Sequence, residues 1–274
     1  MIASQSRQAS LAVRGATLTY LGVLVALPLG VLAFQVARSG PAAFLKALAD
    51  PIALHSLKLT FITAAVMVVI NVVTGTATAW VLVRYAFPGK NLVDALIDLP
   101  FAVPTVVTGV MLVALYGPAS AVGTVLGQHG VALIYQQPAI VLALLFVTFP
   151  FVVRSVQPVL LALDLAEEEA AATLGAGPFT TFRRVTLPAI MPAILTGAGL
   201  SLSRAFGEFG SVVMVAGNRP MSTKTAPLYI FGEIESGHQN EAMAISVVLL
   251  AASLAVLFAL NWLQRQGGNE QYGH

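Results

Sequence analysis

The sequence predicts an all-α membrane protein, a polytopic bundle of transmembrane helices, on three observations. Of its 274 residues, 57% are hydrophobic and only 9% are charged, and the mean hydropathy is +0.85. Soluble domains are about 45–50% apolar and about 25% charged, so this composition excludes a soluble globular domain and a disordered chain. Unbroken apolar blocks at 61–70 and 245–260 exclude a transmembrane barrel, whose strands alternate apolar and polar residues.

Six stretches are long and apolar enough to cross the hydrocarbon core, which takes about 20 residues of helix. The first could instead be a signal peptide, but Gln35, Val36 and Ala37 do not form a small-x-small cleavage site, so an uncleaved span is favoured. No compositional break divides the chain, so we expect residues 1–274 to form one domain. The predicted spans are 17–37, 57–83, 95–116, 138–161, 189–216 and 242–263.

The distribution of Lys and Arg near the span ends favours an orientation with both termini in the cytoplasm. In that orientation the outer side holds Arg38, Lys46, Lys58, Arg219 and Lys224. The inner side holds the larger group of Arg7, Arg14, Arg84, Lys90, Arg154, Arg183, Arg184 and Arg265. The connection at 162–188 is then cytoplasmic.

Several classes of site are not expected in this chain. The net charge of +2 and the scarcity of charge give no basis for nucleic-acid binding, and there is no cysteine. The four histidines are far apart in the sequence, so no metal site is predicted. Gly89-Lys90 is followed by Asn91 rather than Ser or Thr, so the chain has no phosphate-binding loop and is not expected to be an enzyme or to bind a cofactor.

The connection at 162–188 has the pattern of a capped helix outside the membrane. Asp164 followed by Glu167 is typical of a helix start, and Gly175 is placed where a left-handed C-terminal stop is expected. Pro178 suits the first position of a second short helix, which Arg183 and Arg184 would end. A small, alanine-rich helix of this kind suits docking into a groove of another protein, although a plain connector is equally compatible with the pattern.

A fixed motif lies within this connection. Glu169-Ala170-Ala171 is followed after three residues by Gly175, and after nine more by Val185, Thr186 and Leu187-Pro188. This spacing resembles the signature loop of permease subunits of ATP-binding-cassette importers, in the MetI-like (type I) family of binding-protein-dependent transport components. That family more often has Ile where Val185 stands. The resemblance implies that the loop docks into a separate ATPase through Glu168, Glu169, Ala170, Ala171, Gly175, Leu187 and Pro188.

Further segments indicate which branch of this family the chain resembles. The stretch 94–109 resembles the third span of sulfate/thiosulfate permeases of the CysT type, and 203–210 resembles a motif shared by sulfate and molybdate permeases. The run 217–228 is closest to the CysT type. The resemblance implies an inner-membrane subunit that works with two ATP-binding subunits carrying ATP and Mg²⁺, a second related permease and an external sulfate-binding protein. A molybdate or tungstate permease, or an anion transporter that works without an ATPase, remains an alternative.

Arg204 and Glu208 are one helical turn apart in the fifth predicted span. A charge at membrane depth costs on the order of 2.5–3.5 kcal/mol, so such residues suggest a function. Two interpretations stay open: Arg204 supplies positive potential on an anion's route, or the pair only holds the helix in place. Pro100 and Pro104 are expected to kink the third span, where Thr105 and Thr108 could bond the freed carbonyl groups. Together with Arg204 and Glu208, these two threonines are the candidate residues of the substrate pathway.

Small and polar residues recur at helical spacing on two spans. Gly199, Ser203 and Gly207 are expected to let another helix approach the fifth span closely. Asn71, Thr74 and Thr78 form a polar stripe on the second span, for which interhelical hydrogen bonding is favoured over lining a pore.

Overall fold

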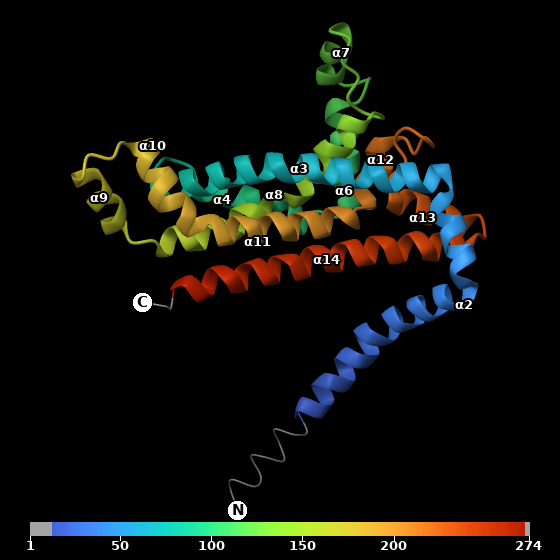
Figure 1. The fold of residues 1–274 in the computed structure, drawn as a ribbon. Coiled ribbons are helices and arrows are strands. Elements are labelled where there is room, and N and C mark those ends of the chain that lie inside the picture. Colours follow the sequence, from blue (N-terminus) through green and yellow to red (C-terminus); the bar gives the residue numbers. More distant parts are fainter. Residues whose placement is uncertain (1–12, 272–274) are drawn as a thin grey trace, which may run out of the picture.

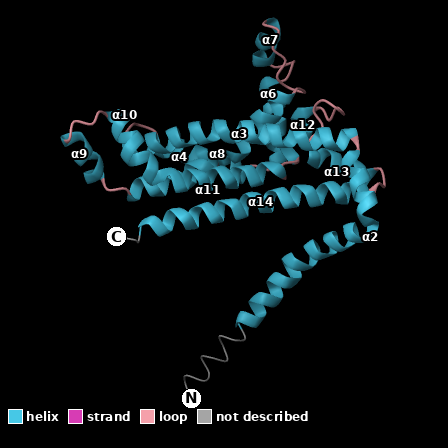
Figure 2. Cartoon of the chain, viewed as in Figure 1, coloured by secondary structure: helices cyan, strands magenta, loops and turns pink. Residues whose placement is uncertain are grey.

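The computed structural model describes residues 13–271, and the secondary structure in that range is helical, with no strand (Figures 1 and 2). Two short π-helical segments, η1 and η2, lie within longer helices. The elements are η1 (Gly22–Ala26), α2 (Leu27–Ala49), α3 (Pro51–Arg84), α4 (Lys90–Ile97), α5 (Leu99–Ala102), α6 (Thr105–Tyr116), α7 (Ala121–Gln128), α8 (Gln137–Ala162), α9 (Leu165–Thr173), α10 (Pro178–Thr181), η2 (Phe182–Thr186), α11 (Leu187–Phe206), α12 (Gly210–Ala216), α13 (Ala226–Glu235) and α14 (Gln239–Gln271).

Helix α8 is the centre of the bundle and packs between α3 and α11. Val152 of α8 is completely buried and faces a glycine on each neighbour. A Cβ atom added at Gly75 of α3 would stand 2.9 Å from Val152 Cβ, and one at Gly197 of α11 would stand 2.7 Å from Val152 Cα. Small residues at these positions therefore allow the three backbones to approach closely, which is a common way to pack helices in a membrane.

Three predicted spans are confirmed as continuous helices. α3, α8 and α14 contain the stretches 57–83, 138–161 and 242–263 and extend each of them by a few residues. Asp50 starts α3, because its carboxylate accepts a hydrogen bond of 2.9 Å from the backbone N–H of Ala53.

The first helix is longer than the predicted span 17–37 and runs from Val13 to Ala49. It changes direction at Gly40, whose φ of 81° lies outside the helical region, directly before Pro41. The helix is apolar but buries none of its central residues in the bundle, and in Figure 1 its first part lies apart from the other helices.

The third predicted span, 95–116, is not one helix. It is divided into α4 and α5 on one side and α6 on the other, with a bend of 115° between the two parts. Pro104 lacks an N–H group and holds the preceding Val103 in an extended conformation (φ −82°, ψ 126°), so the helix cannot continue through this point. The kink expected at the prolines is therefore confirmed, as a break rather than a bent helix.

The fifth predicted span, 189–216, is also interrupted, which corrects the continuous helix expected there. α11 ends at Phe206, and α12 begins at Gly210. The break falls at Gly207 and Glu208, and the carboxylate of Glu208 accepts a hydrogen bond of 2.9 Å from Ser211 N–H at the start of α12. A carboxylate at a helix N-terminus is favourable, which explains why a new helix starts here.

The two ends of the bundle carry different structures. α9 and α10 lie together at one end, and the C-terminal part of α14 points toward the same end (Figure 1). The bend of α2, the short helix α13 and the loop before it lie at the opposite end, while α7 projects away from the bundle. The predicted cytoplasmic loop is thus separated from the predicted outer loops by the length of the bundle.

Candidate coupling loop and translocation groove

Helix α9 forms as its sequence predicts. Asp164 accepts a hydrogen bond of 2.9 Å from the backbone N–H of Ala166, and Glu167 and Glu168 lie in the first turn. At the other end Gly175 has φ +84°, and its N–H donates to the carbonyl oxygen of Ala172 at 3.0 Å. A residue with a side chain would pay about 1–2 kcal/mol in this left-handed conformation. Both the helix start and the left-handed stop are therefore confirmed.

Glu168 faces the rest of the chain. Its Oε1 atom lies 2.6 Å from Arg84 Nη2 and accepts a hydrogen bond of 3.0 Å from the hydroxyl of Thr186. Arg84 is the last residue of α3, and Thr186 directly precedes α11, so Glu168 ties α9 to two long helices at once. The two charged side chains are 14% and 19% exposed, so this contact is shielded from bulk solvent. Glu168 thus fixes the position of α9 relative to α3 and α11.

The other side of α9 is open. Glu169 and Ala170 are exposed and Ala171 is half-buried. Two large apolar side chains follow α9: Leu174 at its C-terminal end is 89% exposed, and Phe179 in α10 is 75% exposed. A rigid helix with exposed apolar groups at the tip of a bundle is a surface suited to a partner protein.

The second short helix is not separate, which corrects the expectation for 178–188. Pro178 begins α10 as predicted, but α10 continues through η2 into α11. Arg183 and Arg184 therefore lie inside a longer helix, on its exposed side.

Leu187 and Pro188 of the motif belong to the base of the loop. Leu187 packs against the buried cluster that contains Val152 and Ile190, and Pro188 lies in the first turn of α11. The rings of Trp80 and of Phe182 in η2 also meet at nearly a right angle, with ring centroids 5.3 Å apart. These contacts fix where the loop leaves the bundle.

Arg204 and Glu208 form the expected ion pair, with 2.7 Å between Arg204 Nη2 and Glu208 Oε2. Their exposure differs greatly, because the Glu208 side chain is 1% exposed and that of Arg204 is 37% exposed. The second carboxylate oxygen of Glu208 accepts from both the N–H and the hydroxyl of Ser211, each at 2.9 Å. Glu208 therefore has a clear structural use, while the side chain of Arg204 is partly exposed.

Thr105 and Thr108 lie in the first turns of α6 but do not take the role expected of them. The hydrogen bonds of the described residues include none from either hydroxyl to the carbonyl groups that the prolines free. Thr105 instead abuts Gly210 of α12, where an added Cβ would collide with its hydroxyl. Thr108 is 2% exposed.

A groove of about 1070 Å³ runs between α3, the bent third span and α8, and Thr108 is part of its lining. Most of the lining is apolar. Its polar side chains include the expected stripe of Asn71, Thr74 and Thr78. Asn71 is buried and donates to Thr148 of α8 at 2.8 Å, so it forms the expected interhelical bond. Thr74 and Thr78 bond only to the backbone of α3, and their hydroxyls border the groove.

The row of small residues on α11 is used only in part. A Cβ at Gly199 would collide with Leu260 of α14, so Gly199 allows these helices to approach. The hydroxyl of Ser203 is buried without a partner. Gly207 is exposed and an added Cβ would meet nothing within 4 Å, so it makes no close helix contact within residues 13–271.

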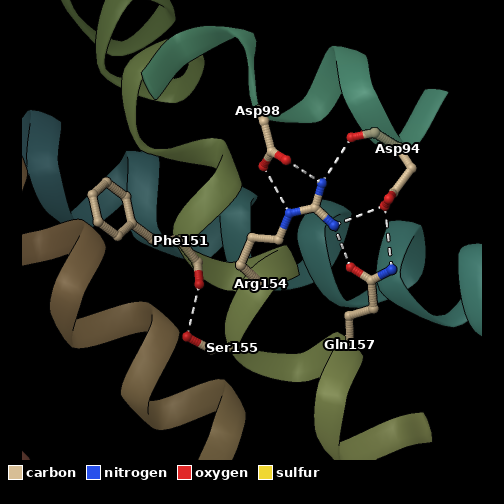
Figure 3. A network of polar contacts seen from close by, with 6 residues as sticks. All are labelled: Asp94, Asp98, Phe151, Arg154, Ser155 and Gln157. Atoms are coloured by element: carbon tan, nitrogen blue, oxygen red, sulfur yellow. Dashed lines mark hydrogen bonds and ion pairs between the residues drawn. The ribbon is translucent and has the colours of Figure 1, made fainter. Parts of the chain in front are cut away.

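A cluster around Arg154 was not predicted (Figure 3). Arg154 of α8 binds Asp94 and Asp98, with 2.7 Å from Nη1 to Asp94 Oδ1 and from Nε to Asp98 Oδ1. Gln157 completes the group and donates to Asp94 Oδ1 at 3.2 Å. A lone arginine in an apolar span, together with aspartates four residues apart at the start of the preceding span, was the signal that could have revealed it.

Within residues 13–271 no group of three or more His, Asp or Glu side chains could hold a metal ion. The polar clusters described above are ion pairs and helix caps.

Comparison with known proteins places these features in a family. The family model for the "binding-protein-dependent transport system inner membrane component" matches residues 71–266. The chain is 43% identical to a probable sulfate transport system permease protein cysT of Nephroselmis olivacea, over 90% of this chain and 87% of the relative. It is 40% identical to the sulfate transport system permease protein CysT of Escherichia coli, over 95% and 94% of the two chains.

Solved structures share the fold. A chain of a bacterial ABC transporter that imports the acidic polysaccharide alginate superposes with a TM-score of 0.79 at 17% identity, covering 96% of each chain. A chain of the MetNI methionine ABC transporter in an inward-facing conformation gives a TM-score of 0.57 at 20% identity, covering 78% of this chain and 94% of the other.

Proposed function

We propose that this chain, which belongs to the family of binding-protein-dependent transport system inner membrane components, is a permease subunit of an ATP-driven sulfate importer. In this proposal it forms the translocation pathway with a second, related permease. The observation that carries the proposal is the arrangement of helix α9. Glu168 fixes α9 to the bundle, whereas Glu169 and Ala170 are exposed. Leu174 and Phe179, after α9, are exposed apolar side chains. The named relatives support the choice of substrate.

The attachment of α9 supports a role in coupling. A partner that pushes on the exposed side of α9 would act through Glu168 on the end of α3 and on the start of α11. Because α8 leads into α9 through only Leu163 and Asp164, the central helix of the bundle would receive the same push. A movement of the partner would therefore reach three of the long helices without a flexible link.

The proposed complex contains two ATP-binding subunits, which carry ATP and Mg²⁺, and a periplasmic or extracellular sulfate-binding protein. This chain holds no nucleotide in the proposal. It spans the inner membrane several times with α9 and both termini in the cytoplasm. The C-terminal part of α14 and α9 lie at the same end of the bundle, which supports that orientation (Figure 1).

Arg204 is proposed to act on the anion's route. A dianion needs positive potential to cross the apolar interior of a membrane, and Arg204 lies outside the mainly apolar lining of the groove beside α3. The Arg204 side chain is 37% exposed although it is paired with Glu208. Arginine suits this role because its planar donors match oxyanions.

Charge reversal on α9 tests the coupling surface. Glu169→Lys would place a cation on the exposed side, and we expect the ATP-binding subunits to be lost from the purified complex by about tenfold or more, as for a charged contact at an interface. Glu167→Lys is the matched control, since it makes the same change two positions earlier, on nearly the opposite side of the helix. Equal recovery of the ATPase with both variants would count against the interface.

Transport by the assembled complex tests the substrate. Proteoliposomes with the ATPase and the binding protein should take up labelled sulfate only when ATP is supplied. Parallel assays with thiosulfate, molybdate and tungstate distinguish the related oxyanions. Uptake of molybdate in preference to sulfate would replace the proposed substrate. Uptake without ATP would instead indicate an anion transporter of another class.

A further inference from the structure

We propose that a second groove, between the end of α3 and the helix formed by α10, η2 and α11, binds one anionic phospholipid of the cytoplasmic leaflet. An acyl chain would lie in this lipid groove, and the phosphate would bind Arg183 and Arg184. The inference takes from the proposed function only the orientation that places α9 in the cytoplasm, and it adds a ligand other than the transported anion.

The lipid groove has a volume of about 590 Å³ and a mainly apolar lining. It shares no lining residue with the groove beside α3 and α8. One wall runs from Val72 to Tyr85, where α3 ends, and the other runs from Pro178 to Ile194. From Val72 to Trp80 the wall is about 12 Å long. The groove thus follows the direction of two long helices, which is also the direction of an acyl chain in a bilayer.

Thr76 brings an unused hydroxyl group to this groove. The residue is only 9% exposed, yet its hydroxyl has no hydrogen-bond partner within residues 13–271. The hydroxyls of Thr74 and Thr78, on the same helix, both bond to backbone carbonyl groups of α3. A buried polar group without a partner is rare and calls for an explanation. A ligand in the groove would supply the missing partner.

The depth of Thr76 suits the ester group of a phospholipid. Helix α3 has 34 residues, and the hydrocarbon core of a bilayer takes about 20 of them. With the core centred on the helix, its inner boundary falls close to Thr76. The ester groups of phospholipids lie at this boundary and accept hydrogen bonds, so the Thr76 hydroxyl would donate to one of them.

Aromatic side chains mark the end of the groove that is nearer to α9. Trp80 and Phe182 meet there with ring centroids 5.3 Å apart, and Tyr85 is 58% exposed. Tryptophan and tyrosine are enriched at the level of lipid headgroups, because their rings contact apolar groups while their polar atoms reach water. This end therefore has the composition of a membrane interface, and the deeper end is apolar.

Two cations directly follow Phe182. Arg183 and Arg184 are exposed, and neither has an ion-pair partner in the part of the chain that the structure describes. Arg84, at the end of α3, is already paired with Glu168 at 2.6 Å. Arginine donors match phosphate oxygens, and basic pockets between helices on the cytoplasmic side suit anionic headgroups. The two free cations favour an anionic lipid over an apolar helix of another subunit.

Lipid retention by the full chain tests the site. After extraction from vesicles of equal parts phosphatidylglycerol and phosphatidylethanolamine, native mass spectrometry should show one retained phosphatidylglycerol, favoured about tenfold over the other lipid. Ala77→Trp fills the groove from its exposed side and should remove the retained lipid. Ala65→Trp makes the same change at an exposed position of α3 outside the groove and is the matched control. Equal retention by the two variants would overturn the site.

Two further variants test the polar contacts. Arg183→Gln with Arg184→Gln should abolish the preference for phosphatidylglycerol, whereas Arg14→Gln with Lys90→Gln removes two cations from the same predicted side and should keep it. An unchanged preference in the first variant would overturn the anionic headgroup. Thr76→Val keeps the side-chain shape and should lower retention about threefold, as for one lost hydrogen bond. Unchanged retention would overturn the bond to the ester group.

Photocross-linking distinguishes a lipid from a protein in the assembled complex. Val73 in the groove and Val69 outside it are 65% and 66% exposed, so a photoreactive p-benzoylphenylalanine can replace either. At Val73 the adduct should be mainly phosphatidylglycerol, and at Val69 it should follow the composition of the membrane. A cross-link from Val73 to another polypeptide would overturn the lipid as the occupant.

These measurements do not depend on sulfate uptake. A complex that fails to transport sulfate would overturn the proposed function and leave the retention and cross-linking results as they stand. A complex that transports normally, but whose subunit retains no phosphatidylglycerol, would overturn the lipid site alone.

Discussion

The third and fifth predicted spans are both interrupted, but by different chemistry. In the third, Pro104 removes a backbone donor, and the two halves diverge by 115° with no side chain capping the second half. In the fifth, α11 ends before Gly207, and the next helix is capped by Glu208, which is itself paired with Arg204. The break in the third span, which has no side-chain cap, is called the open break below. The break in the fifth span, where the buried carboxylate of Glu208 joins α11 to α12, is called the fastened break.

The difference indicates what each break can do. The fastened break keeps α11 and α12 in a fixed relation, because moving them apart would leave the buried Glu208 charge without partners. The open break has no comparable bond to lose. Mobility is therefore expected at the prolines, and rigidity at the glutamate.

The largest expected effect comes from removing the fastening at the fifth span. Glu208→Ala leaves Arg204 without its partner and Ser211 N–H without its cap, and we expect a loss of about 3 kcal/mol of stability. Thermal unfolding of the purified subunit would show this as a lower Tm. A Tm equal to that of the parent would mean that the carboxylate does not fasten the break.

A neutral double variant serves as its control. Arg204→Gln with Glu208→Gln keeps an oxygen to accept from Ser211 N–H and leaves no charge unpaired. We expect this variant to be nearly as stable as the parent. Assembly with the ATPase but loss of uptake would show that Arg204 serves the anion, whereas full uptake would leave the pair a structural role only.

A medium effect is expected where α6 meets α12. Gly109→Leu would push a side chain into Met214 and the carbonyl of Ser211, at a cost of about 1–3 kcal/mol. The same change at Gly127 of α7, where an added Cβ meets nothing within 4 Å, is the matched control. Equal Tm values for the two variants would show that the outer half of the third span is not held tightly.

The smallest effect is expected at Gly207, beside the fastened break. Its φ is −98° and its surroundings are open, so Gly207→Ala should change stability by no more than about 0.5 kcal/mol. Gly40→Ala provides the contrast, because a φ of +81° disfavours any side chain. A large loss at Gly207 in the assembled complex, but not in the isolated subunit, would point to a contact with another subunit.

Local signals in the sequence predicted the start and the end of α9 well. The start of α9 at Asp164 and its stop at Gly175 each depend on bonds that reach only a few residues along the chain. The same holds for the extended residue before Pro104. Such features follow from backbone geometry alone, so they can be read without knowledge of the fold.

Contacts between distant residues could not be predicted in this way. Glu168 faces inward because Arg84, 84 residues earlier, is at its side, and no local pattern distinguishes it from Glu169. Arg154 finds Asp98 and Asp94 across 56 and 60 residues. The break at Gly207 and Glu208 was missed because most of the predicted span 189–216 is apolar, and hydropathy does not record where a helix stops.

The first helix has a consequence for how this protein can be altered. From Val13 to Gly40 it contributes no buried residue to the bundle, and the family model that matches the chain begins only at residue 71. Within this chain, its sequence is therefore constrained mainly by the need for hydrophobic side chains, and less by close packing against other helices. Residues in the first part of this helix, which lies apart from the other helices in Figure 1, are the natural place to install probes, altered apolar sequences or fusion partners, whereas Ser39 bonds Asn240 of α14 at 3.2 Å.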